Sequence, residues 1–168
     1  MRFYTPEECS NWLSRLGRTK PDHEKGLETA LFDYPKEPHA IFVTALWFAQ
    51  SFMLGKPVLL WITESGIWPS SENWPLYYKL RQGAGDSRLL HEAPGHIFLE
   101  DEADDLASFA QIAILNGWGG YLLPEANRVN AFFSHDEYFE FFAASPAMMT
   151  EVRQFWAARG AAEHFMGG

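Results

Sequence analysis

Residues 57–66, PVLLWITESG, give the clearest indication of the fold, because a short apolar run follows directly after the helix-breaking Gly55-Lys56-Pro57. The run Val58–Thr63 is almost continuously apolar, as in a strand that is buried on both faces. The preceding residues, Pro38–Leu54, are apolar on nearly all sides, which is typical of a central helix. Gly55 and Pro57 end that helix. The sequence therefore predicts a buried helix followed by an interior strand.

The same reading extends outward along the chain. Further helices are predicted at 5–17, where Thr5 and Glu8 form a capping box, and at 72–82, 102–116 and 146–160. Further strands are predicted at 97–99, 121–123, 129–133 and 138–142, with a helix as the alternative for 138–142 because the alternation there is poor. Residues 18–38 are predicted to be a loop with one helical turn near 25–31, residues 84–95 to be irregular, and residues 161–168 to be a loose tail. We expect a single α/β or α+β domain over 1–168, with a mixed sheet of about four to five strands and helices on both faces.

Composition narrows the class of protein. The 168 residues carry a net charge of −9, which disfavours direct nucleic-acid binding and suits a basic protein partner. The single Cys9 excludes an internal disulfide and a multi-cysteine zinc site. The apolar run Ala40–Ile62 is interrupted at Gly55–Pro57, and its helix of about 15 residues is shorter than a membrane span. With no apolar signal region at the N-terminus and a lone thiol, we expect a cytoplasmic protein without a membrane segment.

A first candidate site is HEAPGH at 91–96, where His91, Glu92 and His96 have the side chains of metal ligands. The two histidines are separated by Pro-Gly, so they do not share a helix face as in H-E-x-x-H. Joined by His135, they would form a zinc or other divalent metal site, with Glu92 and His135 as the catalytic pair of a hydrolase. The alternative is a turn whose histidines bind backbone carbonyls, without any cofactor.

A second candidate is Ser134-His135-Asp136-Glu137, which follows a predicted strand at a position where open sheets often bind ligands. The same residue types are common in hairpin turns, and turn chemistry alone accounts for them. A third candidate is the face formed by Trp74, Tyr78 and Arg81, at helical spacings of four and three. This face would stack a base and bind a phosphate, or else belong to the core.

The strongest charge signal lies between Leu89 and Asn127, a segment without Lys or Arg. Acidic residues are favoured at a helix start by the helix dipole, which accounts for two or three of those found here. Five carboxylates in six residues are more than the helix dipole accounts for. We therefore expect an acidic surface that binds a basic partner, formed by Glu100, Asp101, Glu102, Asp104 and Asp105.

The runs LLWITESGIWPSSENWPLYYKLRQGAGDSRLLHEAPGHIFL, NGWGGYLL and FFSHDEYFEFF resemble a set of small bacterial proteins of unknown function. The resemblance covers about Val58 to Ala143. It implies a compact bacterial domain and brings no catalytic residues with it. HEAPGH also resembles the HExxPGH letters of some zinc peptidases, but one residue is missing between Glu92 and Pro94.

These observations favour a non-enzymatic binding protein over an enzyme. An acidic domain of this size suits an immunity-type inhibitor that neutralises a basic bacterial toxin, and it is compatible with a homodimer. The alternative is a metal-dependent hydrolase that uses the His/Glu cluster. A nucleotide-binding sensor that uses the Trp74 face is a third hypothesis.

Overall fold

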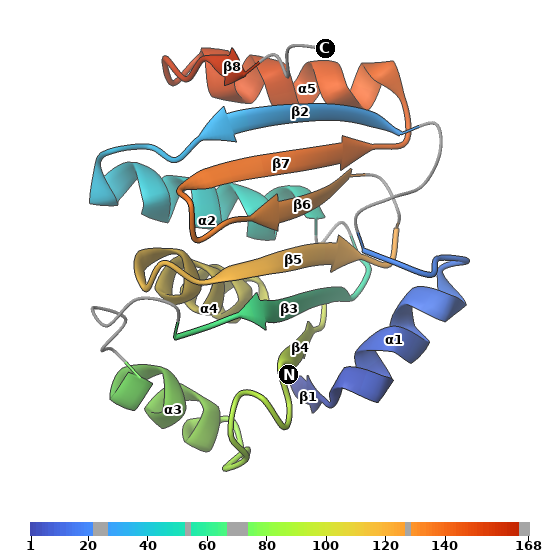
Figure 1. The fold of residues 1–168 in the computed structure, drawn as a ribbon, viewed down its shortest axis with the longest axis vertical. Helices are drawn as coiled ribbons and strands as arrows, with labels where there is room; N and C mark the ends of the chain where they lie inside the picture. The colour runs from blue at the N-terminus through green and yellow to red at the C-terminus, as the bar shows by residue number, and fades with distance from the viewer. Residues whose placement is uncertain (22–26, 53–54, 67–73, 127–128, 165–168) are drawn as a thin grey trace.

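The computed structural model describes residues 1–21, 27–52, 55–66, 74–126 and 129–164. In these residues eight strands form one sheet, with five helices packed around it (Figure 1). The strands are β1 (Arg2–Tyr4), β2 (Glu28–Asp33), β3 (Val58–Glu64), β4 (Gly95–Phe98), β5 (Gly119–Pro124), β6 (Val129–Phe133), β7 (Tyr138–Ala143) and β8 (Glu163–His164). The helices are α1 (Pro6–Arg15), α2 (Pro38–Phe52), α3 (Trp74–Gly83), α4 (Ala103–Leu115) and α5 (Pro146–Ala157).

The strand order is β1-β4-β3-β5-β6-β7-β2-β8, and each pair of neighbours is antiparallel. The predicted mixed sheet of about four to five strands is therefore wrong in strand number and direction. The prediction missed β1, β2 and β8. β2 occupies residues assigned to the loop 18–38, and β8 lies in the predicted loose tail. β1 and β8 are too short to show a period, and β2 is stabilised by a partner strand, β7, that is distant in the sequence.

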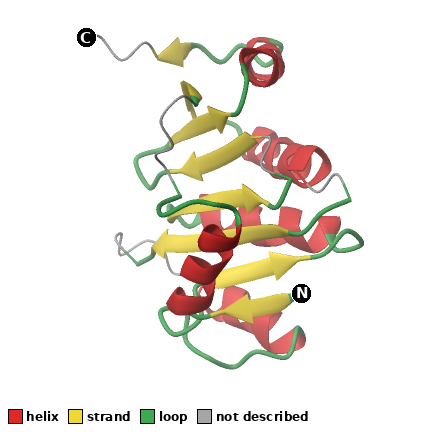
Figure 2. Cartoon of the chain, turned by 90° about the vertical axis from the view of Figure 1, so that its right-hand side faces the viewer, coloured by secondary structure: helices red, strands yellow, loops and turns green. Residues whose placement is uncertain are grey.

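The sheet is covered unevenly on its two faces, and Figure 2 shows it as one continuous twisted stack of strands. Alternate residues of β3 point to opposite sides. Leu60 faces the main core, to which α2, α3, α4 and α5 contribute. Leu59 faces a smaller cluster that α1 covers through Trp12 and Leu13. The prediction of helices on both faces is thus only partly right, because α1 is the one helix of the described residues that packs against the second side.

Local signals set most helix boundaries as predicted. The Thr5 hydroxyl accepts a hydrogen bond from the Glu8 amide, and the Glu8 carboxylate accepts one from the Thr5 amide, which completes the capping box of α1. The Ser145 hydroxyl caps α5 by accepting a hydrogen bond from the Met148 amide. α2 begins at Pro38 as predicted, and its last predicted residues, 53 and 54, lie outside the described part of the chain. It is less central than expected, since Phe42 is 43 % exposed.

One end of the sheet brings distant segments together. β2, β3 and β6 all end there, and β5 and β7 begin there, at the left of Figure 1. The C-terminal end of α4 reaches the same side, because residues 116–118 lead directly into β5. Within the described residues no helix is both long enough and apolar enough to cross a membrane.

Candidate functional site

The β6–β7 turn, residues 134–137, is a tight hairpin held by its own backbone. The Ser134 amide donates to the Tyr138 carbonyl at 2.9 Å, and the Ser134 hydroxyl accepts from the Asp136 amide at 3.1 Å. Glu137 has φ +64°, in the left-handed region that non-glycine residues seldom occupy. The Glu137 carbonyl accepts from the Tyr34 amide at 2.7 Å. The turn is therefore fixed to the segment that follows β2.

A cavity of about 740 Å³ opens beside this turn. Its walls come from three places: the end of β2 with the segment leading into α2, the end of α4, and the turn itself. The lining residues are 33–36, Ile41, 114–117 and 135–137. A volume of this size is in the range of small-molecule and side-chain binding pockets, about 300–1,000 Å³. We take this cavity and its rim as the candidate site.

His135 is oriented at the edge of the cavity by a carboxylate from another strand. Its Nδ1 lies 2.6 Å from Oε2 of Glu64, and its Nε2 lies 3.5 Å from Oδ1 of Asp136. Glu64 can reach the imidazole because its register partner across β3 and β5 is Gly119. A Cβ at Gly119 would collide with the Glu64 carboxylate. The absence of a side chain there therefore makes room for the His135–Glu64 contact.

Two buried side-chain polar atoms of residues that line the cavity have no hydrogen-bond partner among the described residues, and both have essentially no accessible surface. They are the Tyr34 hydroxyl and Nδ2 of Asn116. Burial raises the pKa of the Tyr34 phenol well above its usual value, with the charge of Glu137 adding to the effect, so the hydroxyl keeps its proton. An unpaired buried polar group costs about 1–3 kcal/mol. Sequence reasoning missed both residues, since a lone Tyr and a helix-ending Asn carry no functional signal by themselves.

HEAPGH does not form a histidine pair. His96 lies on the inward side of β4 and is fully buried, whereas His91 is exposed. Nδ1 of His96 donates to the Pro94 carbonyl at 3.2 Å, which leaves Nε2 to accept from the Tyr77 hydroxyl at 3.0 Å. Burial, helped by the charge of the nearby Arg81, lowers the pKa of His96 to about 3. The imidazole is therefore neutral and both of its nitrogens are engaged.

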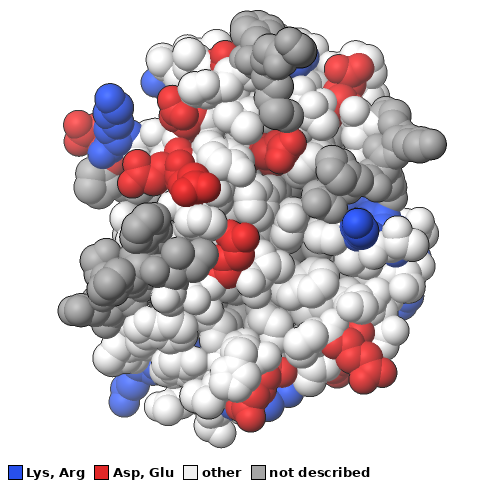
Figure 3. Space-filling model, in the orientation of Figure 1, with Lys and Arg blue, Asp and Glu red and all other residues white. Residues whose placement is uncertain are grey.

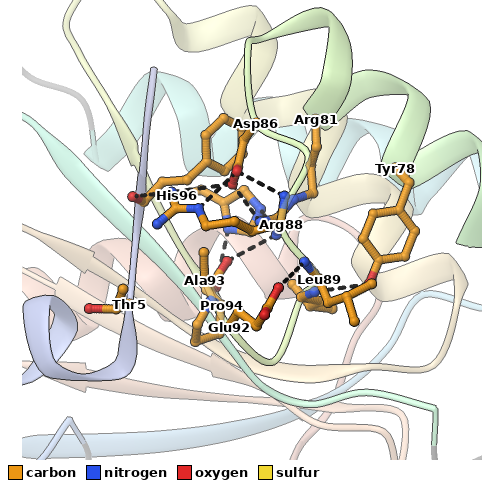
Figure 4. A network of polar contacts seen from close by, with 12 residues as sticks. Thr5, Tyr78, Arg81, Asp86, Arg88, Leu89, Glu92, Ala93, Pro94 and His96 are labelled. Atoms are coloured by element: carbon orange, nitrogen blue, oxygen red, sulfur yellow. Dashed lines mark hydrogen bonds and ion pairs between the residues drawn. The ribbon is translucent and has the colours of Figure 1, made fainter.

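The neighbouring Glu92 closes the turn before β4. Its carboxylate accepts from the Leu89 amide at 2.7 Å (Figure 4). His135, the third predicted ligand, contacts Glu64 at the end of the sheet described above. Among the described residues no three His, Cys, Asp or Glu side chains are grouped closely enough to hold a metal ion. The proposed zinc ligands are thus not brought together in this part of the chain.

Trp74, Tyr78 and Arg81 do share one face of α3, as their spacing predicts, but the face is turned into the protein. Trp74 stacks on Tyr78 with ring centroids 5.9 Å apart, and the Tyr78 hydroxyl accepts from the Leu90 amide. Arg81 is fully buried and forms an ion pair with Asp86 at 2.7 Å (Figure 4). Its guanidinium is therefore already neutralised, and it does not lie at the rim of a pocket as a phosphate site would need.

The acidic cluster 100–105 lies at the start of α4, and part of it has a structural role. The Glu102 carboxylate accepts from the Leu99 amide at 2.8 Å and contacts the amino group of Met1. Asp104 and Asp105 lie in the first turn of α4, where the helix dipole favours negative charge. Glu100, Asp101, Asp104 and Asp105 are exposed. They remain a candidate partner surface, at the opposite end of α4 from the cavity.

Comparisons of the chain with protein-family models, with curated proteins and with solved structures found no match.

Proposed function

We propose that this protein is a non-enzymatic binding protein for a basic protein partner, and that it uses the carboxylates around the cavity at the end of the sheet. The narrower proposal is an immunity-type inhibitor of a basic bacterial toxin. The observation that carries the proposal is the composition of the rim. Asp33, Asp136 and Glu137 line it, with Lys36 as the one Lys or Arg among the lining residues. Glu64 adds a further carboxylate next to His135.

The rim carboxylates are accessible to a partner. The side chains of Asp33 and Asp136 are 70 % and 64 % exposed. Figure 3 shows acidic side chains gathered in the upper left of the view, where β2, β6 and β7 meet at one end of the sheet in Figure 1. Exposed charges contribute little binding energy individually, but together they accelerate the encounter with a partner of opposite charge. The net charge of −9 acts in the same direction.

Charge reversal on the turn tests this proposal. We expect Asp136→Lys with Glu137→Lys to slow association with a basic partner by about tenfold at low salt, and to flatten its salt dependence. The partner is chosen from a panel of small basic proteins that includes bacterial nucleases, and association is followed by stopped flow at low and high salt.

Two comparison variants locate the effect. Glu151→Lys reverses one charge at an exposed position of α5, away from the rim, and shows what a change in net charge does at half the size of that in the double variant. Asp104→Lys with Asp105→Lys reverses the cluster at the other end of α4, and a stronger effect there would move the partner surface to residues 100–105. The proposal is overturned if no basic protein in the panel binds with a salt-dependent rate.

A second candidate function, acid–base catalysis by His135, rests on the 2.6 Å contact with Glu64. If Nδ1 donates to Glu64, Nε2, which lies 3.5 Å from Oδ1 of Asp136, would be the basic nitrogen beside the cavity. In the metal-dependent form of this second function, a zinc ion would act together with His135. Elemental analysis of the native protein beside His135→Gln tests for the metal, and a panel of ester, amide and phosphate substrates tests for activity. We expect a catalytic His135 to lose turnover by at least about a hundredfold in His135→Gln, whereas a binding protein shows no turnover in either form.

A further inference from the structure

We infer that the outward face of α2 and α4 is the interface of a homodimer, in which it packs against the same face of a second copy of the chain. This inference goes beyond the proposed function and does not rest on it, because it concerns two helices and not the carboxylates around the cavity. Three observations carry it: an outer helix without charged residues, exposed apolar side chains on that helix, and a second helix that extends the same surface.

α2 is an outer helix with the composition of an inner one. Its sequence, PHAIFVTALWFAQSF, contains no Asp, Glu, Lys or Arg. A helix that is apolar on all sides is normally buried on all sides, whereas a surface helix normally has charged residues on the side away from the core. α2 has its inward side in the main core, where Phe48 and Ala49 are fully buried, and its outward side at the surface. This conflict between composition and position indicates that another surface covers the outward side.

The outward side of α2 is a continuous uncharged stripe. Phe42, Leu46 and Gln50 follow one another at intervals of four residues, which places them on one side of the helix. Phe42 is 43 % exposed, Gln50 is exposed and Leu46 is half-buried. The ring of His39, one turn before Phe42, stacks on it with the centroids 6.4 Å apart. The stripe is therefore accessible to a partner along most of the helix.

α4 extends this surface. Both helices pack on the same side of the sheet (Figure 1), and they run in opposite directions, since Ile41 near the start of α2 and Leu115 at the end of α4 line one cavity. Leu115 is 49 % exposed, and Ile112 in the same last turn is half-buried. Residues 106–115 of α4, LASFAQIAIL, contain no charged side chain. The outward sides of the two helices thus form one uncharged face with exposed apolar residues.

The charge of the chain favours a second copy as the occupant of this face. Each copy carries a net charge of −9, so two copies repel each other wherever charged surfaces meet. A face without charge is where this repulsion is weakest. A basic partner would gain no ion pair there and is better matched by the carboxylates elsewhere on the surface. Two such faces related by a two-fold axis are complementary to each other, because the ridges of one helix pair fit the grooves of the other.

The size of the face suits a weak dimer. Two helices of the length of α2 lying side by side are about 22 Å long and about 20 Å wide. The flat area is then about 450 Å² on each copy and about 900 Å² on both, near the lower limit of about 1,000 Å² for a specific interface. We therefore expect a dimer in equilibrium with a folded monomer, with a dissociation constant in the micromolar range.

The experiment is analytical ultracentrifugation of the full chain at concentrations up to about 100 μM, at low and high salt. We expect the average mass to rise with concentration from that of one chain towards that of two. High salt should leave the dimer intact or strengthen it, because the interface contains no ion pairs and salt screens the repulsion between the copies.

Three variants locate the interface. Phe42→Glu places a carboxylate in the face of both copies, and we expect it to raise the dissociation constant at least about a hundredfold, because that charge would lose its water without gaining a partner. Leu115→Glu makes the same test on α4 and is expected to have the same effect. Leu76→Glu is the matched control: Leu76 is 52 % exposed on α3, so the variant has the same change in net charge outside the face and should still dimerise. Circular dichroism checks that each variant is folded.

Each outcome either supports or overturns the inference. A wild-type chain that stays monomeric over the whole concentration range overturns it. So does a dimer that survives both Phe42→Glu and Leu115→Glu, which would place the interface elsewhere, and so does a dimer that Leu76→Glu dissociates equally, which would make the effect one of net charge. The proposed function is tested separately, because charge reversal at Asp136 and Glu137 affects the binding of a basic protein and is expected to leave the dimer unchanged.

Discussion

Arg81→Ala is expected to lower the free energy of unfolding by about 3–5 kcal/mol, because it leaves buried polar groups without their partner. The guanidinium is fully buried. It donates to Oδ2 of Asp86 at 2.7 Å and to the Ala93 carbonyl at 2.9 Å, and it lies 4.8 Å from the ring centroid of Phe3. One side chain thus connects α3, the segment before β4, and β1.

The matched control is Lys79→Ala on the same helix. Lys79 is exposed, so its removal is expected to change the free energy of unfolding by no more than about 0.5 kcal/mol. Urea denaturation of the two variants beside the wild type measures the difference. Asp86 keeps a second partner in Arg88, whose Nε lies 2.9 Å from its Oδ1, which favours the lower end of the range. A loss below about 1 kcal/mol would show that water replaces Arg81 in this network.

His96 is expected to make stability fall with acid over a wide pH range. The folded protein keeps the imidazole neutral down to a pKa of about 3, because of burial and then the charge of Arg81. The unfolded chain binds a proton near pH 6.5. Between these values the unfolded state holds more protons, so stability decreases as pH falls, by about 1.4 kcal/mol per pH unit. Above pH 7 the contribution is fully present.

His96→Gln tests this expectation, because glutamine does not titrate and so takes up no proton when the protein unfolds. We expect the free energy of unfolding of the variant to fall less steeply between pH 6 and pH 4 than that of the wild type. The difference between the two slopes should approach about 1.4 kcal/mol per pH unit, which corresponds to the uptake of one proton. The window ends near pH 4 because Asp86 also contributes in stronger acid. Hydrogen bonds from Arg88 and the charge of Arg81 lower the pKa of that carboxyl despite its burial. Its stabilisation is therefore lost only below the usual Asp range. Equal slopes for wild type and variant would contradict the buried neutral imidazole.

Structural features that depend on only a few consecutive residues could be predicted from the sequence. The capping box of α1 needs only Thr5 and Glu8, and the start of α5 needs only Ser145 and the proline after it. The turn 134–137 lies between β6 and β7 as its residue types indicate. In each case the hydrogen bonds that stabilise the feature lie within the segment itself, so the sequence pattern contains the physical cause.

The central order of helix, strand and hairpin could be predicted from the sequence, because apolar spacing and chain-breaking residues act over short distances. Which side chains contact one another follows instead from how the strands and helices pack. Glu64 reaches His135 through the strand register at Gly119, and Arg81 is buried because Asp86 folds back to neutralise it. Tyr34 and Asn116 line one cavity because β2 pairs with β7 and α4 ends beside the same turn. These contacts depend on pairings between residues far apart in the chain, and no local pattern encodes such register.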